Sequence, residues 1–126
     1  LLKKTNPGFD LNEDEWLAFA QTIFAERNGV PTLDYDPGLA NTLPPRETLL
    51  KAPLPDMWPV FSALNGLPAA AIRGENSDLL SPATLIEMQN HHTSLLAETI
   101  PGRGHTPFLT EPAALAAIRR TLQQAG

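Results

Sequence analysis

The sequence predicts an α/β fold built on a βαβ unit, the repeating unit of a doubly wound sheet. Short apolar runs end near Arg73 and at Ile100, and their length and composition are typical of buried parallel strands. Ser81 and Pro82 begin a helix between them, as an N-cap followed by proline at the first helical position. A last amphipathic segment follows Pro112. Helices flanking two strands joined by a helical crossover predict this fold class.

A capped helix is predicted over residues 13–27. Asn12 is a favourable N-cap, and Glu15 completes a capping box. Asn28 and Gly29 are then expected to end the helix in the left-handed conformation. Apolar side chains recur at helical spacing, and we interpret them as core, with lining of a substrate pocket as the alternative: Trp16, Phe19, Ala20, Ile23 and Phe24.

A proline-rich segment over residues 30–54 is expected to be irregular, with a helical turn between Arg46 and Lys51. Asp34 and Asp36 are two possible metal ligands, but no third ligand lies near them in the sequence. We therefore interpret this tract as a solvated turn.

The second half of the chain contains further helix signals. Asp56 is expected to cap a helix that ends at Asn65–Gly66, and Thr110 is expected to cap the last helix. Leu115, Ile118, Arg119 and Leu122 would complete the face of that last helix. His91 and His92 follow the middle helix, but adjacent side chains point apart, so we do not interpret them as a metal pair.

Composition excludes several function classes. The 126 residues carry a net charge of −5 with scattered basic residues, which does not favour nucleic acid as a partner. No apolar run approaches the ~20 residues of a membrane span. The chain has no cysteine, which excludes disulfides and thiolate chemistry. We expect no cofactor, no membrane partner and, by default, a cytoplasmic location.

Asp78 and His105 are the candidate catalytic residues. Each follows a predicted strand, and ligands of open α/β sheets collect beyond the carboxyl ends of the strands. A carboxylate that accepts a hydrogen bond from histidine Nδ1 fixes the tautomer, and the other ring nitrogen can then act as a base. Taken singly, Asp78 could cap a turn and His105 could be a buried hydrogen-bonding residue. Gly102 and Gly104 would let the histidine loop turn sharply.

Two motifs resemble the C-terminal portion of the α/β-hydrolase family. The tract Ile72-Arg73-Gly74-Glu75-Asn76-Ser77-Asp78 looks like its acid-bearing strand and turn, and Gly102-Arg103-Gly104-His105-Thr106-Pro107-Phe108-Leu109-Thr110-Glu111-Pro112 looks like its histidine loop. The match covers residues 54–123. The resemblance implies that Asp78 is the triad acid and His105 the triad base, and that Phe108 and Leu109 help to pack the loop. Residues 1–53 would be a cap-proximal helix and connector, and residues 54–126 part of the hydrolase core.

One departure from the family is large, because no Gly-x-Ser-x-Gly motif occurs in these residues. Ser77 lies beside the acid, and Ser62 lies in a predicted helix, so neither resembles the family nucleophile. We expect a chain that hydrolyses esters, or related acyl or C–C bonds, only together with an upstream nucleophile. The alternatives are an Asp-nucleophile dehalogenase or epoxide hydrolase, and a non-catalytic binding or assembly module. An open sheet edge would favour a homodimer or a swapped assembly.

Overall fold

The computed structural model describes residues 2–51, 53 and 55–126, and it forms two compact units. One unit combines Lys3–Asp10 with Met57–Gly126, and the other comprises Leu2 and Leu11–Asp56. The segment Lys3–Asp10 belongs with the C-terminal unit, although no local sequence pattern links it to residues 57–126. The division into domains at residues 53 and 54 stays a prediction.

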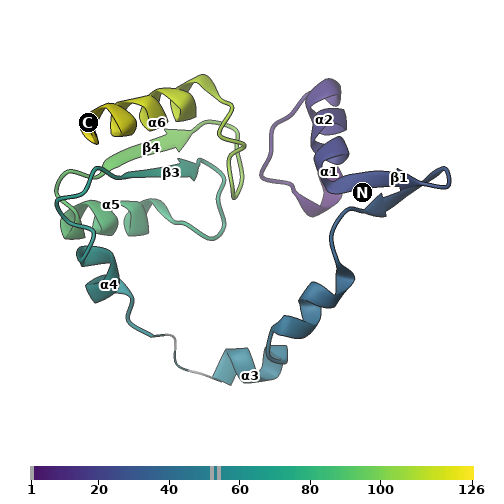
Figure 1. Ribbon diagram of the computed structural model, residues 1–126, viewed down its shortest axis with the longest axis horizontal. Coiled ribbons are helices and arrows are strands. Elements are labelled where there is room, and N and C mark those ends of the chain that lie inside the picture. The colour runs from purple at the N-terminus through teal and green to yellow at the C-terminus, as the bar shows by residue number, and fades with distance from the viewer. Residues whose placement is uncertain (1, 52, 54) are drawn as a thin grey trace. The chain divides into compact units, whose positions relative to one another are not determined.

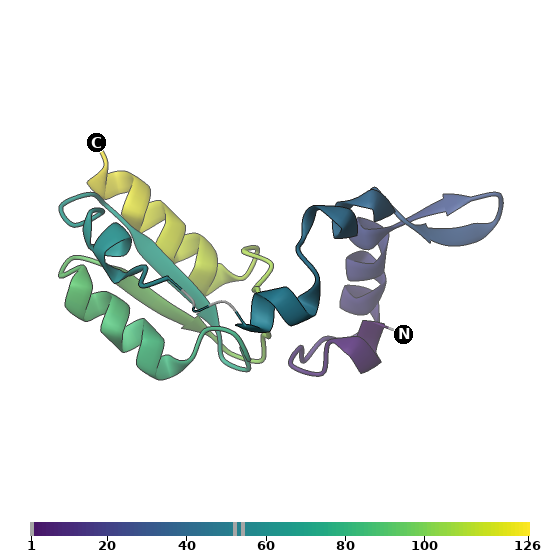
Figure 2. The same cartoon turned by 90° about the horizontal axis from the view of Figure 1, so that it is seen from below.

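The larger unit contains a parallel two-stranded sheet between two helices. Strand β3 (Ala70–Gly74) pairs with β4 (Leu96–Ile100), in a register that joins Ala70 to Leu96 and Gly74 to Ile100. Helix α5 (Pro82–His91) connects the strands, and α6 (Pro112–Gln124) follows them. The helices α5 and α6 lie on opposite sides of the sheet (Figures 1 and 2). The predicted α/β class and its βαβ unit are therefore confirmed.

The core of this unit lies on both faces of the sheet. On one face Ala71, Leu85 and Leu95 form a buried cluster, against which Phe61 and Met88 pack. On the other face the contact is made by alanines of α6, since Ala114 and Ala117 are fully buried. Leu115 and Leu122 are exposed instead, so the predicted face of α6 was wrong for these two leucines. Small side chains let a helix approach a sheet closely, and the large ones are left on the outer side.

Two of the three helix caps predicted in the second half were wrong. Ser81 caps α5 as expected, accepting a hydrogen bond from the Thr84 N–H at 3.0 Å. Helix α4 (Trp58–Ser62) starts from Met57 rather than Asp56, because the Met57 backbone is already in the helical region and its carbonyl accepts from Phe61 N–H. Helix α6 starts from Glu111 rather than Thr110.

The smaller unit begins with helix α2 (Glu13–Ile23), and its Asn12–Glu15 capping box is confirmed. The predicted helix over 13–27 was wrong beyond Ile23. Residues Phe24–Arg27 form strand β1, which pairs antiparallel with β2 (Val30–Leu33). Asn28 and Gly29 have φ values of 56° and 77°, as a two-residue hairpin turn of type I′ requires. The left-handed conformation expected at Asn28–Gly29 is therefore present, but it forms a hairpin turn and not the end of a helix, because residues 24–27 pair with residues 30–33.

Short helices complete the described chain: α1 (Leu2–Thr5), a 3₁₀ helix over Pro37–Thr42, and the predicted α3 (Arg46–Lys51). Asp34 is exposed and lies 3.5 Å from Arg27, while Asp36 accepts from the Gly38 N–H at 2.8 Å. Both aspartates therefore take part in turn contacts. Within the described residues, none of the helices combines the length and apolarity of a membrane span.

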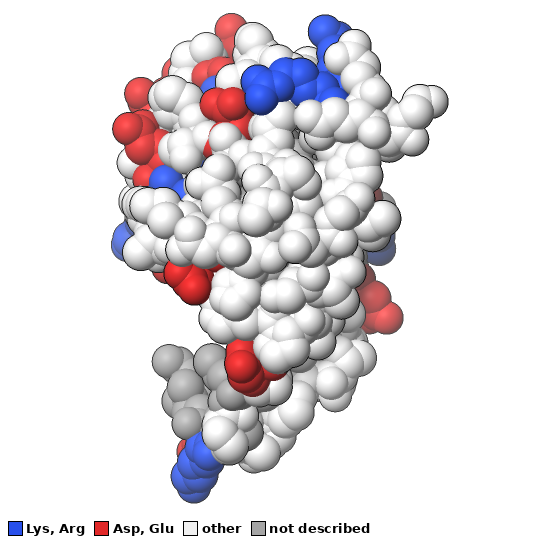
Figure 3. Space-filling model, turned by 90° about the vertical axis from the view of Figure 1, so that its left-hand side faces the viewer, with Lys and Arg blue, Asp and Glu red and all other residues white. Residues whose placement is uncertain are grey.

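The larger unit also exposes uncharged surface around α4. Met57, Val60 and Leu67 are each more than half exposed. Figure 3 shows a face of the molecule whose centre is uncharged, with most of its acidic and basic side chains toward the upper edges.

Candidate active site

The loops that carry Asp78 and His105 leave the same edge of the sheet. Strands β3 and β4 are parallel neighbours, so both loops begin at adjacent carboxyl ends. The backbones are joined directly, since Glu75 N–H donates to Ile100 C=O at 2.9 Å and Asn76 N–H donates to Arg103 C=O at 2.9 Å. A Cβ at position 74 would overlap the carbonyl oxygens of Arg103 and Gly104. Glycine at position 74 therefore permits the close approach of the two loops.

Both predicted site residues line one pocket of about 300 Å³. Asp78, Leu79 and Asn76 come from the loop after β3, residues 75–80, which we call the acid loop. Gly104 and His105 come from the loop after β4, residues 101–111, which we call the histidine loop. The other wall is the segment Thr5–Phe9, which belongs to the same compact unit. Asp78 and His105 are both exposed to solvent. The structure thus brings the two candidate residues to one concave, partly polar surface.

No hydrogen bond or ion pair joins Asp78 to His105 in the part of the chain that the structure describes. The His105 Nδ1 atom lies 3.4 Å from Ser77 Oγ instead. Ser77 Oγ also accepts from the Leu80 N–H at 3.0 Å, which leaves the serine hydrogen free to point at the imidazole. For Asp78 to orient His105 as a triad acid does, the imidazole must turn from Ser77 toward the carboxylate.

The segment Asn6–Asp10 holds the two loops from the outside. Asn76 Nδ2 donates to Gly8 C=O at 3.0 Å, and Asp10 N–H donates to Gly102 C=O at 2.8 Å. The ring of Phe9 stacks on Phe108 with 5.3 Å between centroids. No local sequence signal links this segment to residues about 70 to 100 positions away. Phe108 packs against this segment as expected, whereas Leu109, which was also expected to pack the loop, is exposed.

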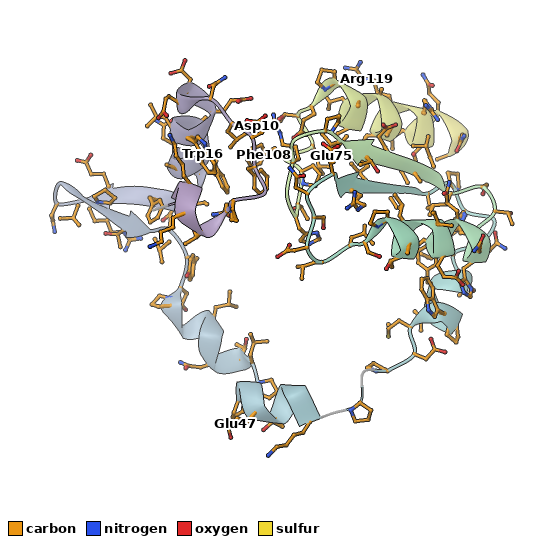
Figure 4. All side chains as sticks on the ribbon, turned by 180° about the vertical axis from the view of Figure 1, so that it is seen from behind. Asp10, Trp16, Glu47, Glu75, Phe108 and Arg119 are labelled. Atoms are coloured by element: carbon orange, nitrogen blue, oxygen red, sulfur yellow. The ribbon has the colours of Figure 1, made fainter. Side chains whose placement is uncertain are left out.

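An ion pair closes the histidine loop around His105. Arg103 Nε lies 3.0 Å from Glu111 Oε1, and both side chains are largely buried. The same oxygen accepts from Phe108 N–H at 3.2 Å, and Arg103 Nη1 donates to Asp10 C=O at 2.7 Å. Asp10 and Phe108, whose backbones make these contacts, are labelled in Figure 4. The pair therefore joins the residues on either side of His105.

The charge state of Glu111 follows from these contacts. Burial by itself raises the pKa of the Glu111 carboxyl. Hydrogen bonds from the backbone N–H groups of Glu111 and Phe108, and the hydrogen bond and charge of Arg103, lower that pKa by more. The pKa of Glu111 consequently lies below its ordinary value of 4.5. Glu111 is therefore a carboxylate at neutral pH.

The other histidines lie outside the pocket. His91 Nδ1 is 2.9 Å from Ser62 Oγ, its Nε2 is 3.3 Å from Glu87, and its ring stacks on Trp58. His92 is fully buried at the end of α5. In the described ranges, no group of three or more histidine, aspartate or glutamate side chains is arranged to hold a metal ion.

Comparison with known proteins identifies the fold to which this site belongs. A crystal structure of an α/β hydrolase from Novosphingobium aromaticivorans matches 98% of the chain with a TM-score of 0.82 and 34% identity. The chain is the C-terminal part of an α/β-hydrolase fold. A 3-hydroxybutyrate-oligomer hydrolase from Cupriavidus necator is 34% identical over an alignment of 110 residues, and the match covers 82% of the chain. The chain spans 36% of that relative and 43% of the solved hydrolase. No family profile matches the sequence.

Proposed function

We propose that Asp78 and His105 are the acid and the base of an ester-cleaving α/β hydrolase whose nucleophile lies outside these 126 residues. The observation that carries the proposal is their position on adjacent loops at the carboxyl ends of parallel strands, where both line one pocket. The α/β-hydrolase fold of the chain and the hydrolase activity in the name of its relative support a hydrolytic reaction. The missing Gly-x-Ser-x-Gly motif supports a nucleophile from elsewhere.

The proposed roles follow the chemistry of a serine-type triad. Asp78 accepts a hydrogen bond from His105 Nδ1 and holds the tautomer in which Nε2 has a free lone pair. His105 Nε2 takes the proton of the nucleophile hydroxyl as its oxygen attacks the ester carbonyl carbon. The proton then goes to the leaving alcohol as the ester C–O bond breaks. Water repeats the sequence on the acyl-enzyme, which releases the acid and restores the hydroxyl.

The proposed substrate class is a short oligomer of a hydroxy acid. One relative is named a 3-hydroxybutyrate-oligomer hydrolase, and such oligomers are joined by ester bonds. The pocket suits units that alternate a polar ester with a small apolar group. Asn6 and Asn76 supply polar groups along its walls, while Phe9 and Leu79 supply apolar ones.

The test compares this chain with a longer product in which the same reading frame is extended. The 126-residue chain should not hydrolyse a 3-hydroxybutyrate dimer, whereas a product that adds a Gly-x-Ser-x-Gly segment should. In that product, Asp78→Asn and His105→Ala should each lower kcat by about 10³ to 10⁴ fold. His91→Ala, outside the pocket, is the matched control and should leave kcat within a few fold.

Three results would change the proposal. Turnover by the 126-residue chain that His105→Ala abolishes would mean that the nucleophile lies within it. An active longer product that tolerates both Asp78→Asn and His105→Ala would remove their catalytic roles. An aspartate at the nucleophile position would indicate dehalogenase or epoxide hydrolase chemistry instead.

The proposed partner of the isolated chain is a second copy. Among the described residues, β3 and β4 pair only with each other, so each strand has one unpaired edge. Unpaired edges favour pairing with another chain. We therefore expect a homodimer or swapped assembly by light scattering, and a monomer at all concentrations would contradict this expectation.

A further inference from the structure

Arg73 is a buried cation without a carboxylate partner in the described part of the chain. It lies in β3 and is only 6% exposed. Its Nε donates to Leu80 C=O at 2.6 Å, and its Nη2 donates to Glu75 C=O at 2.9 Å. Removing a charge from water is costly unless hydrogen bonds compensate it. The compensation here comes from backbone carbonyls of the acid loop.

The two carbonyls belong to the residues that bracket Asp78. Glu75 begins the acid loop after β3, and Leu80 ends it before the N-cap of α5. A guanidinium is planar, and its donors have a fixed spacing, so the two hydrogen bonds fix the separation of the loop ends. A lysine ammonium is a point charge and does not offer this fork. The loop cannot widen without breaking at least one bond to a buried charge.

A second set of hydrogen bonds closes the same loop from within. Ser77 N–H donates to Gly74 C=O at 3.0 Å, and Leu80 N–H donates to Ser77 Oγ at 3.0 Å. These amides are therefore protected from exchange only while the loop keeps this shape. They offer a direct measure of the loop that does not depend on catalysis.

We propose that Arg73 is the positioning residue of the acid loop, which it holds in the shape that places Asp78 beside the histidine loop. The role of Asp78 in this inference rests on the proposed function, whereas the bracing of the loop does not. Arg73 touches neither the pocket nor the reacting atoms. It acts on the site through the backbone of residues 75–80.

The experiment uses the 126-residue chain with Arg73→Met and Arg73→Lys. Arg119→Met is the matched control, since Arg119 is exposed on α6 (Figure 4). Amide hydrogen exchange is measured for Ser77 and Leu80, with the β4 amides as an internal reference. Imidazole ¹⁵N shifts of His105 are measured with and without Asp78→Asn in each background.

Arg73→Met should raise the exchange rates of Ser77 and Leu80 by at least about tenfold while the β4 amides keep their protection. Arg73→Lys should give a smaller increase, and Arg119→Met none. The difference that removing the Asp78 charge makes to the His105 ¹⁵N shifts should be smaller in the Arg73→Met background, because Asp78 is then no longer held beside the histidine loop. A role confined to general stability would raise exchange throughout the unit and leave the response to Asp78→Asn unaltered.

Unchanged exchange at Ser77 and Leu80 in Arg73→Met would overturn the proposal. If Arg73→Met does not fold, the test uses Arg73→Lys. Unchanged exchange rates of Ser77 and Leu80 in that variant would also overturn the proposal. Failure of the proposed function has a separate signature. In that case Asp78→Asn leaves the kcat of the active longer product unchanged, whatever the loop amides report.

Discussion

The acid loop is held by an arginine that donates to carbonyls, whereas the histidine loop is held by an arginine paired with a carboxylate. Arg73 bonds only uncharged backbone groups in the acid loop, so acid does not remove its partners. Arg103 depends on Glu111, which can be protonated. We therefore expect the two sides of the site to differ in their sensitivity to pH.

The two sides of the site also differ in the atoms that a Cβ would meet at Gly74 and at Gly104. A Cβ at Gly74 would meet backbone carbonyls, whereas a Cβ at Gly104 would lie 2.7 Å from the Phe9 ring. Backbone atoms cannot move aside independently, but a ring can rotate. The contact between the loops is thus rigid on the β3 side and adjustable on the side of the N-terminal segment.

The largest effect is expected from Gly74→Ala. It should lower the free energy of unfolding by about 3 kcal/mol or prevent folding, because the backbone atoms that the new methyl group meets cannot move aside. Gly104→Ala should lower it by about 1 kcal/mol, because the Phe9 ring can rotate. Urea unfolding followed by circular dichroism measures both. In the Phe9→Ala background, Gly104→Ala should cost less than in the parent chain, whereas the cost of Gly74→Ala should be unchanged. Equal costs for the two alanines would show that the contact between the loops is not rigid.

An intermediate effect is expected from Glu111→Gln. Removing the charge of a largely buried pair leaves Arg103 without its carboxylate, and we expect a loss of about 2 kcal/mol in the free energy of unfolding. Glu75→Gln is the matched control in the acid loop. Its carboxylate is exposed and accepts one hydrogen bond, from Gly102 N–H at 2.9 Å, so about 0.5 kcal/mol is expected. Denaturant midpoints at pH 7 test whether Glu111→Gln is the more destabilising of the two. A larger loss of stability in Glu75→Gln would contradict the prediction.

The smallest effect is the pH dependence that Glu111 contributes. Its pKa is lower in the folded chain than in the unfolded chain, so the unfolded chain binds the proton first. The stabilisation is complete above the ordinary value of 4.5 and is lost as the pH falls through the lowered pKa. Denaturant midpoints between pH 6 and pH 3 should therefore fall less steeply in Glu111→Gln than in the parent chain. If the midpoints of the two proteins fell equally with pH, Glu111 would not contribute the expected pH dependence.

Local signals predicted much of the C-terminal unit. The Ser81–Pro82 start, the two short strands and the order of elements all depend on neighbouring residues, and they were confirmed. The helix over 13–27 was wrong in its last turn because helical spacing and strand pairing compete there. The Asn28–Gly29 turn with β2 supplies cross-strand hydrogen bonds that a continued helix would forgo.

The sequence by itself determined the α/β class and the placement of Asp78 and His105 after the two parallel strands, because capping, strand composition and loop glycines act over a few residues. Only the tertiary structure decided what surrounds them. The wall formed by Thr5–Phe9 and the pairing of Phe9 with Phe108 join residues far apart in the chain. The same is true of the contact between Gly74 and Gly104, and no local pattern encodes such proximity. The two hydrogen bonds of Arg73 close a short loop, but the burial of the Arg73 side chain comes from tertiary packing. The neighbouring residues in the sequence do not reveal that burial.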